Sequence, residues 1–393
     1  MLDFNGTNAS ITRNNTTCFD ILDDGECKNE DDVRTYLATY IIPEWYEWIV
    51  ITVYILTFII GLTGNVLVCF AVWRNHQMRT VTNMFIVNLS VADLGIILIC
   101  LPPTLLVDVT ETWFMGLVIC KLVYFLMTVS ISVSVLTLAA IAVERWYAIC
   151  RPLAFKSTRR RARVIIFVIW LVSASVALPD IIFLRLKRFE RVPENVSDLL
   201  MSCQPGLDQE QQTAYQIALI VLLYLLPMIC ICVAYIQISH VLWKGDIPGD
   251  GDSRSVTQPM MDTRRINVAN EQLASRRKAA KMLITVVLAF AVCYFPVHLL
   301  NILRYAGVLK YIAVDGIRAY SYVAHWLPYL NSSSNPIIYN FMSAKFRKEF
   351  KMACICCCGP PEKGKQGFTF TSATHYISPN NVGTEQTSLT TMK

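Results

Sequence analysis

The chain has 393 residues, of which 54% are hydrophobic and 16% are charged, and its formal net charge at pH 7 is +6. Soluble proteins average about 25% charged residues, and a soluble fold could not bury this much apolar surface. The composition therefore excludes an ordinary water-soluble domain and indicates a membrane protein.

Residues 1–45 are largely polar and are predicted to form an extracellular, glycosylated segment. No apolar signal peptide precedes the first apolar run, which is therefore expected to act as the insertion signal. Residues 29–42 carry an apolar stripe at helical spacing behind three acidic residues, which predicts an amphipathic helix. This helix could pack on the membrane surface or help to hold a partner peptide in a groove. Sequons predict glycosylation at Asn5, Asn8, Asn14, Asn15 and Asn195.

Seven apolar runs follow, and each is long enough to cross a bilayer, which takes about 20 residues. Backbone polar groups in lipid must be satisfied within the segment or its bundle, so the runs are predicted to be helices. The predicted fold is an all-α membrane protein with a seven-transmembrane helix bundle over residues 46–342. The runs are 48–73, 81–107, 117–143, 164–184, 213–243, 282–303 and 319–342. Internal prolines predict kinks at Pro102, Pro103, Pro179, Pro227, Pro296 and Pro336.

The distribution of Lys and Arg predicts the orientation. The loops after the first and third runs, and the segment between the fifth and sixth, are rich in these residues and are therefore predicted to be cytosolic. The opposite side is poorer in them but not empty, since four basic residues follow the fourth run. Seven crossings then place the N-terminus outside and the C-terminus inside a multi-pass protein of the plasma membrane.

Three cytosolic segments are distinguished by composition. Residues 245–262 are rich in Gly, Pro, Ser and Asp, which predicts a flexible loop. Residues 343–354 combine apolar and basic positions at helical spacing, which predicts an amphipathic helix along the inner leaflet, within a segment that extends to residue 358. Residues 359–393 are polar and predict a disordered tail, which is either a solvated end or a substrate for kinases.

The cysteines fall into two groups. Cys18, Cys27, Cys120 and Cys203 lie on the predicted outer side, where disulfides persist. A bridge between Cys120 and Cys203 would hold the loop before the fifth run over the mouth of the bundle, although four cysteines allow three connectivities. After the last run we expect palmitoylation of four clustered cysteines, because no His accompanies them to support the alternative of a metal cluster. The cysteines concerned are Cys354, Cys356, Cys357 and Cys358.

The apolar runs hold a sparse set of polar residues, including Asn65, Asp93, Arg145 and Asn335. A charge at the centre of a membrane helix costs about 2.5–3.5 kcal/mol or more, so such residues persist where they face the interior of a bundle. We interpret them as the switch of a signalling protein. An enzyme would need a metal motif, a nucleophile elbow or a phosphate loop, and a transporter would show inverted repeats; the sequence contains none of these.

Short motifs in these runs resemble the signatures of rhodopsin-like G-protein-coupled receptors, in order and in the right helices, over about residues 45–358. They are Gly64-Asn65-Val66, Leu89-Ser90-Val91-Ala92-Asp93, Glu144-Arg145-Trp146, Trp170, Pro227, Cys293-Tyr294-Phe295-Pro296 and Asn335-Pro336-Ile337-Ile338-Tyr339. A closer resemblance is to orexin receptors and their invertebrate relatives, the allatotropin receptors. It is carried by residues 75–83, 108–114, 145–150 and 324–327, and by Tyr294, where most rhodopsin-like receptors have Trp.

Three positions depart from these patterns. Glu144 replaces the commoner Asp, and Met127 and Asp180 stand where orexin receptors carry glutamine. The two pocket changes argue against the ligand selectivity of the mammalian receptors. They favour an invertebrate allatotropin- or orexin-like receptor.

The resemblance implies an activation switch at the cytosolic face. Arg145 pairs with Glu144 until the sixth helix swings outward, and then turns toward a heterotrimeric G protein. Arg276 faces Arg145, so that no acid is available there for a second ion pair. The expected switch residues are Glu144, Arg145, Tyr235, Tyr294, Pro296, Asn335, Pro336 and Tyr339.

The resemblance also implies a polar pocket at mid-membrane that suits a sodium ion, because hard cations take oxygen ligands. The alternative is a water-filled cluster around a protonated Asp93, and no other cofactor is expected. The residues of this pocket are Asp93, Ser134, Asn331, Ser332 and Asn335.

The ligand site implied by the resemblance lies between the outer halves of the helices. The third run has no acid near its outer third, and the seventh has no Lys for a retinal Schiff base, so both absences favour a peptide over an amine or retinal. An amidated peptide end would need groups such as Asn301 and His325, although a lone His is as often structural. The predicted lining residues are Thr104, Asp108, Trp113, Met127, Asp180, Tyr215, Tyr294, Asn301, His325 and Tyr329.

We therefore expect a cell-surface receptor for an amidated neuropeptide of the allatotropin or orexin type, with coupling to Gq and calcium release implied by the resemblance. The expected partners are an extracellular peptide, a heterotrimeric G protein, kinases and arrestin at the C-terminal tail, and membrane lipid, with no nucleic acid. The alternatives are a rhodopsin-like receptor for a different peptide or for a lipid, and then a membrane transporter.

Overall fold

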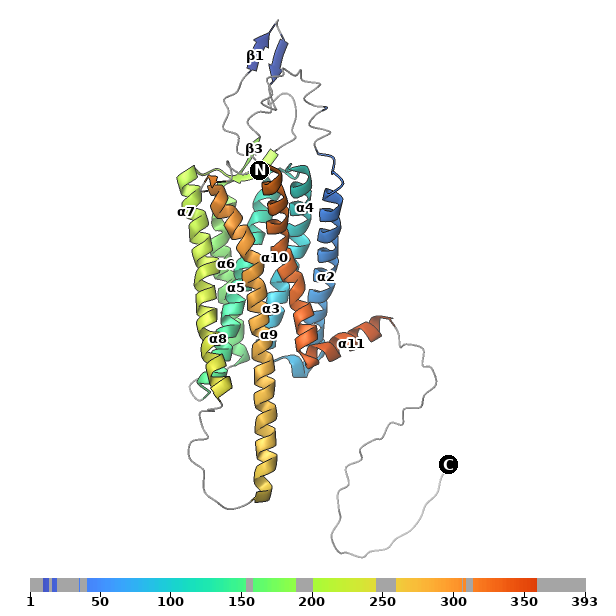
Figure 1. Cartoon of the computed structure of the whole chain (residues 1–393), viewed down its shortest axis with the longest axis vertical. Coiled ribbons are helices and arrows are strands. Elements are labelled where there is room, and N and C mark those ends of the chain that lie inside the picture. Colours follow the sequence, from blue (N-terminus) through green and yellow to red (C-terminus); the bar gives the residue numbers. More distant parts are fainter. Residues whose placement is uncertain are drawn as a thin grey trace, which may run out of the picture. The chain divides into compact units, whose positions relative to one another are not determined.

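The structure is a computed structural model, and it describes residues 10–13, 16–19, 35, 41–152, 158–188, 201–244, 259–305, 307–308 and 314–358. Seven long helical segments dominate this part of the chain (Figure 1). Two of them are continuous stacks of helices joined by a π-helical turn. The segments are α2 (Glu47–Arg74), α3 (Val81–Gly95) with η2 (Ile96–Cys100) and α4 (Leu101–Thr110), α5 (Gly116–Cys150), α6 (Arg159–Phe183), α7 (Gln209–Ile220) with η3 (Val221–Leu225) and α8 (Leu226–Lys244), α9 (Pro259–Tyr305), and α10 (Val314–Met342).

The helices form a closed bundle. Helix α2 packs against α3 and α10, α10 also packs against α9, and α8 lies between α9 and α5. Helix α5 closes the ring because it contacts α3, while α6 packs on α5 from outside and shows most of its apolar surface. Large side chains such as Phe167 and Leu171 of α6 are therefore exposed. Apolar surface of this extent marks contact with lipid or protein partners.

Six of the described segments are long and apolar enough to cross a membrane by length and composition. The seventh, α10, has 29 residues but carries the polar run Asn331 to Asn335 in its middle. Four of these five side chains are buried, all but that of Ser334, so α10 turns most of the run into the bundle rather than toward its surroundings. The predicted seven-helix fold class is confirmed, and two short β-hairpins add to it.

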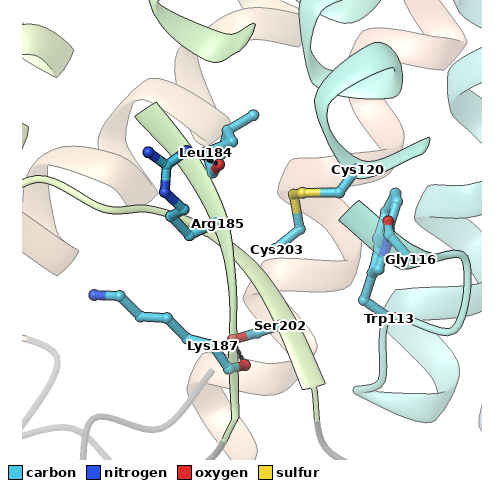
Figure 2. The surroundings of a disulfide bond; sticks show 8 residues. All are labelled: Trp113, Gly116, Cys120, Leu184, Arg185, Lys187, Ser202 and Cys203. Atoms are coloured by element: carbon cyan, nitrogen blue, oxygen red, sulfur yellow. Dashed lines mark hydrogen bonds between the residues drawn. A yellow bond between two sulfur atoms is a disulfide. The ribbon is translucent and has the colours of Figure 1, made fainter. Parts of the chain in front are cut away.

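The β-hairpins were not predicted. Strands β1 (Ser10–Arg13) and β2 (Thr16–Phe19) pair in one, and β3 (Leu184–Arg188) and β4 (Met201–Pro205) pair in the other, both antiparallel. Cys203 of β4 forms a disulfide with Cys120 in the first turns of α5 (Figure 2). The backbone of Trp113 also donates to the carbonyl of Met201 at 2.7 Å. We refer to this end of the bundle as the disulfide end and to the opposite end as the Arg145 end.

The helix boundaries differ from the apolar runs in a regular way. Residues 259–262, expected in a flexible loop, begin α9 instead, because Pro259 is compatible with the first turn of a helix. Helix α5 likewise continues to Cys150. An apolar run marks only the part of a helix that lies in hydrocarbon, so it underestimates helices that continue into water.

Two of the predicted proline sites are accompanied by π-helical turns. Turn η2 ends two residues before Pro102, and η3 ends two residues before Pro227. A proline ring removes a donor and crowds the preceding turn, and a π-turn is one way in which a helix accommodates a break in its ladder. These turns adjust the helix inside two of the segments that line the disulfide end.

Helix α11 (Ala344–Cys358) follows α10 after a one-residue break and agrees with the predicted amphipathic helix. Phe346 and Phe350 are buried, and Phe346 stacks on Tyr339 of α10 with ring centroids 5.5 Å apart. The four cysteines expected to carry palmitate form its last turns. The predicted helix at 29–42 lies outside the described residues except for Thr35 and positions 41–42, as do the tail 359–393 and the five predicted glycosylation sites.

Candidate functional site

Polar side chains converge inside the disulfide end, and Asp108 of α4 is at the centre of one group. The hydroxyl of Tyr54 donates to Asp108 Oδ2 at 2.8 Å, and His325 Nδ1 lies 2.8 Å from Asp108 Oδ1. The side chain of Asp108 is 8% exposed, whereas that of His325 is 30% exposed. One turn of α10 further into the bundle, Tyr329 and Thr104 share a hydrogen bond of 2.7 Å. Four predicted pocket residues are therefore held by contacts between α4 and α10, with Tyr54 of α2 as an unpredicted partner.

A second group lies on the other side of the same end. The hydroxyl of Tyr215 in α7 donates to Asp180 Oδ1 of α6 at 3.1 Å. Thr128 of α5, next to the predicted residue Met127, also interacts with this carboxylate. Asp180 thus connects the consecutive helices α5, α6 and α7.

The remaining predicted pocket residues differ in burial. Trp113 is only 4% exposed, and its indole N–H donates to the carbonyl of Gly116 at 2.9 Å, so it packs in the core beside the disulfide (Figure 2). Tyr294 is 2% exposed and stacks on Phe290 with centroids 4.3 Å apart. Met127 and Asn301 are half-buried. Trp113 and Tyr294 therefore present little surface to a ligand.

An ion-pair network at the disulfide end was not predicted. Glu47 of α2 is 1% exposed, and its Oε1 accepts from Arg318 at 3.1 Å and from Tyr322 at 2.6 Å. Arg318 also lies 3.4 Å from Glu111, at the end of α4. One feature of the sequence could have indicated this network, namely an acid at the edge of the first apolar run, but Arg318 lies just outside the seventh run. This network ties α2, α4 and α10 together.

At mid-bundle, Asp93 is 1% exposed and accepts a hydrogen bond from Asn335 at 2.8 Å. Ser332 interacts with the same carboxylate, and Ser134 of α5 is buried as well. Asn65 of the neighbouring helix α2 donates to the carbonyl oxygens of Gly61 and Ser332. The structure therefore gathers polar residues of α2, α3 and α10 into one buried layer.

Several oxygens in this layer accept no hydrogen bond from the described residues. They are Asp93 Oδ1, Asn65 Oδ1, Asn331 Oδ1, Asn335 Oδ1 and Ser90 Oγ. Buried acceptors without donors are costly, and a cation or water satisfies them. A set of carboxylate, carboxamide and hydroxyl oxygens fits a hard cation such as sodium.

Asn88 illustrates why a sequon inside an apolar run is not a glycosylation site. It is 6% exposed, donates to Thr137 at 2.8 Å and accepts from the indole of Trp170 at 2.9 Å. This network joins α3, α5 and α6. Trp170, which contributed to the family resemblance, is therefore a structural donor.

At the Arg145 end, Arg145 Nε lies 2.7 Å from Glu144 Oε2. Thr82 of α3 donates to the same carboxylate oxygen at 3.1 Å and also contacts the guanidinium of Arg145. Arg145 is therefore held in a group of three side chains from α5 and α3. Thr82 was not predicted, since a threonine in an apolar run carries no distinctive signal.

A cavity of about 200 Å³ opens beside Arg145, between α5, α8 and α9. Arg145, Tyr235 and Arg276 are among its lining residues, so two guanidinium groups face one space, as the sequence predicted. Close by, both Nε and Nη2 of Arg277 donate to the carbonyl of Leu242, at 3.0 and 2.6 Å. The guanidinium of Arg277 in α9 is thus hydrogen-bonded to a backbone carbonyl of α8 and not to a carboxylate.

Comparison with known proteins agrees with this arrangement. Residues 64–339 match the family described as "7 transmembrane receptor (rhodopsin family)". The chain belongs to the rhodopsin family of seven-transmembrane receptors. The family is not one of enzymes, and its members are multi-pass membrane proteins, so both predictions hold for this receptor.

Two relatives cover most of the receptor. It is 34% identical over 311 residues to a QRFP-like peptide receptor of Branchiostoma floridae, which covers 77% of this chain and 76% of the relative. It is 33% identical over 348 residues to neuropeptide FF receptor 1 of Rattus norvegicus, which covers 85% of this chain and 78% of the relative. The resemblance to rhodopsin-like receptors is therefore confirmed, while the closer resemblance to orexin and allatotropin receptors stays a prediction.

Proposed function

We propose that this receptor binds an amidated neuropeptide at the disulfide end, which faces the outside of the cell, and activates a heterotrimeric G protein at the Arg145 end. The observation that carries the proposal is the polar interior of the disulfide end. A receptor for a lipid would be expected to have an apolar interior there, whereas Asp108, His325 and Asp180 are hydrogen-bonding groups suited to a peptide. The names of the two relatives, both receptors for peptides, support the same class of ligand.

The ligand family is the finer part of the proposal. The motifs at residues 75–83 and 108–114 favour an allatotropin- or orexin-like peptide, and the relatives add peptides of the QRFP and neuropeptide FF types as candidates. Asn301 and His325 supply donors and acceptors for a terminal amide. The acids of the disulfide end favour a peptide of net positive charge by steering its approach.

The Arg145 end supports the transducing role. Two guanidinium groups line its cavity, which suits a partner with carboxylates and carbonyl oxygens. Basic residues at the base of α9 and at the start of α6 would contact the G protein and also attract anionic lipid. We propose coupling to the Gq class, with calcium release as the readout, and phosphorylation of the tail by kinases followed by arrestin binding.

The mid-bundle layer supports a sodium ion as an allosteric ligand. Asp93, Ser134, Asn331, Ser332 and Asn335 would hold it, and its positive charge would neutralise Asp93 inside the bundle. The unsatisfied oxygens of Asp93, Asn331 and Asn335 support this assignment. A sodium ion bound to this arrangement would favour it over one in which the helices have moved apart.

The test is a calcium measurement in cells that express the receptor, with untransfected cells as the control. The cells are challenged with amidated peptides of the allatotropin, orexin, neuropeptide FF and QRFP types. The proposal predicts a saturable calcium response to at least one peptide at nanomolar concentration. No response to any peptide, together with a response to lipid mediators, would contradict it.

A further inference from the structure

Asp180 occupies an unusual position for an acid. The residues of α6 that face the bundle are buried at Ile169, Ser173 and Ala177, and Asp180 comes three residues after Ala177 on the same face. Its neighbours are Tyr215 of α7, at 3.1 Å from Oδ1, and Thr128 of α5. The carboxylate therefore points into the disulfide end and not toward lipid.

The second oxygen of Asp180 lacks a hydrogen-bond partner among the residues that the structure describes. Oδ2 is buried and accepts no hydrogen bond from the described residues. No Lys, Arg or His nitrogen of these residues lies within 4.0 Å of the carboxylate. Arg185 of β3, the nearest cation in the sequence, donates instead to the carbonyl oxygens of Ile182 and Leu184. Tyr215 thus satisfies Oδ1, whereas the described part of the chain leaves Oδ2 unsatisfied.

The other buried acids of the receptor have different surroundings. Glu47 is paired with Arg318, Asp108 with His325, and Glu144 with Arg145. Asp93 lies in the proposed sodium pocket, and Glu349 of α11 accepts a hydrogen bond from Asn75 at 2.8 Å. A buried carboxylate that lacks a counter-charge is costly inside a membrane bundle, and such groups mark sites of ligand or ion binding. Among the acids inside the disulfide end, Asp180 is the one for which the described residues supply no positively charged or imidazole partner.

We propose that Asp180 binds an arginine side chain of the peptide. The guanidinium offers several N–H donors in one plane, so that it can satisfy Oδ2 and the hydroxyl of Thr128 while Tyr215 retains Oδ1. A lysine would supply charge but not this planar set of donors. The inference rests on the proposed function, and it assigns to Asp180 the selection of a cationic residue in the peptide.

The test uses the most potent peptide of the amidated panel and analogues in which each arginine in turn is replaced by citrulline, its uncharged isostere, or by lysine. Potency is measured on the wild type, on Asp180→Asn and on Asp180→Glu, with surface expression quantified through an N-terminal tag. Glu111→Gln is the matched control, because Glu111 is an acid at the same end that is already paired with Arg318.

The citrulline substitution in the peptide and Asp180→Asn in the receptor should each lower potency, and the two losses should not be additive. One citrulline substitution should weaken the peptide at least about tenfold on the wild type, and Asp180→Asn should weaken the parent peptide by a similar factor. That citrulline analogue should lose no further potency on Asp180→Asn, whereas on Glu111→Gln it should lose as much as on the wild type. Asp180→Glu should retain part of the discrimination, and the lysine analogue should fall between arginine and citrulline.

The contrary results separate the two proposals. Three results would each overturn the role of Asp180. The citrulline analogue could lose further potency on Asp180→Asn, this variant could respond fully to the parent peptide, or the most potent peptide could contain no arginine. The proposed function would stand in all three cases. A wild-type receptor that responds to no peptide of the panel would overturn both.

Discussion

Replacing Glu144 by Gln should raise the activity of the receptor in the absence of ligand. The carboxylate of Glu144 is 8% exposed and holds two partners, Arg145 at 2.7 Å and Thr82 at 3.1 Å. Gln keeps the size of the side chain but removes the charge that restrains the guanidinium. The arrangement in which Arg145 is paired is therefore weakened relative to the one in which Arg145 turns toward the G protein.

The magnitude follows from the geometry of the pair. A hydrogen bond to a charged group contributes about 1.5–3 kcal/mol, and the lower end applies because the side chain of Arg145 is 28% exposed. A loss of about 1.5 kcal/mol changes the equilibrium about tenfold. If the active form makes up about 1% of the unliganded receptor, it should rise to about 10%.

The assay is ligand-independent G-protein activation in cells, measured by energy transfer between G-protein subunits at several matched surface densities. Glu47→Gln is the control, because it neutralises a buried, paired acid at the opposite end of the bundle. The slope of activity against density should rise severalfold for Glu144→Gln and stay unchanged for Glu47→Gln. Equal slopes for Glu144→Gln and the wild type, with the peptide response intact, would refute the reasoning.

Three further predictions concern other parts of the bundle. Arg318→Ala leaves the buried Glu47 without its cation and should cost about 3 kcal/mol, seen as an apparent melting temperature several degrees lower in the purified receptor; an unchanged value would argue against the ion pair. In the wild type, agonist binding should weaken when sodium chloride replaces potassium chloride, and Asp93→Asn should abolish this effect of sodium. A sodium effect that survives the substitution would exclude this pocket. Arg277→Lys cannot make both bonds to the carbonyl of Leu242 and should raise basal activity about twofold to threefold, because α9 is then held less firmly to α8; an unchanged basal rate would show that these bonds do not restrain α9.

The sequence was most informative where a single physical constraint dominates. A run of about 20 apolar residues must be helical in lipid, so the seven segments could be predicted without knowledge of their packing. A polar residue in such a run must face inward, so the contact of Asp93 with Asn335 was predictable as well. Helix ends were harder to locate, since α9 begins at Pro259, far before its apolar part.

The sequence was less informative where a side chain has two plausible uses. Tyr54 looked like one apolar residue among many, yet its hydroxyl fixes Asp108. Trp113 was expected to line the pocket, but its ring packs beside the disulfide. Thr82 and Arg318 acquire their roles from partners 62 and 271 residues away, which no local pattern encodes.

The most direct test of the account is to measure peptide binding and G-protein activation side by side in the wild type and in Arg145→Ala. The substituted residue lies at the end of the bundle opposite to the proposed ligand site, so binding should stay within about threefold of the wild type while activation is lost. Activation equal to that of the wild type at the same surface density would show that Arg145 does not transmit the signal. It would contradict the central claim that a ligand at the disulfide end controls a switch at the Arg145 end.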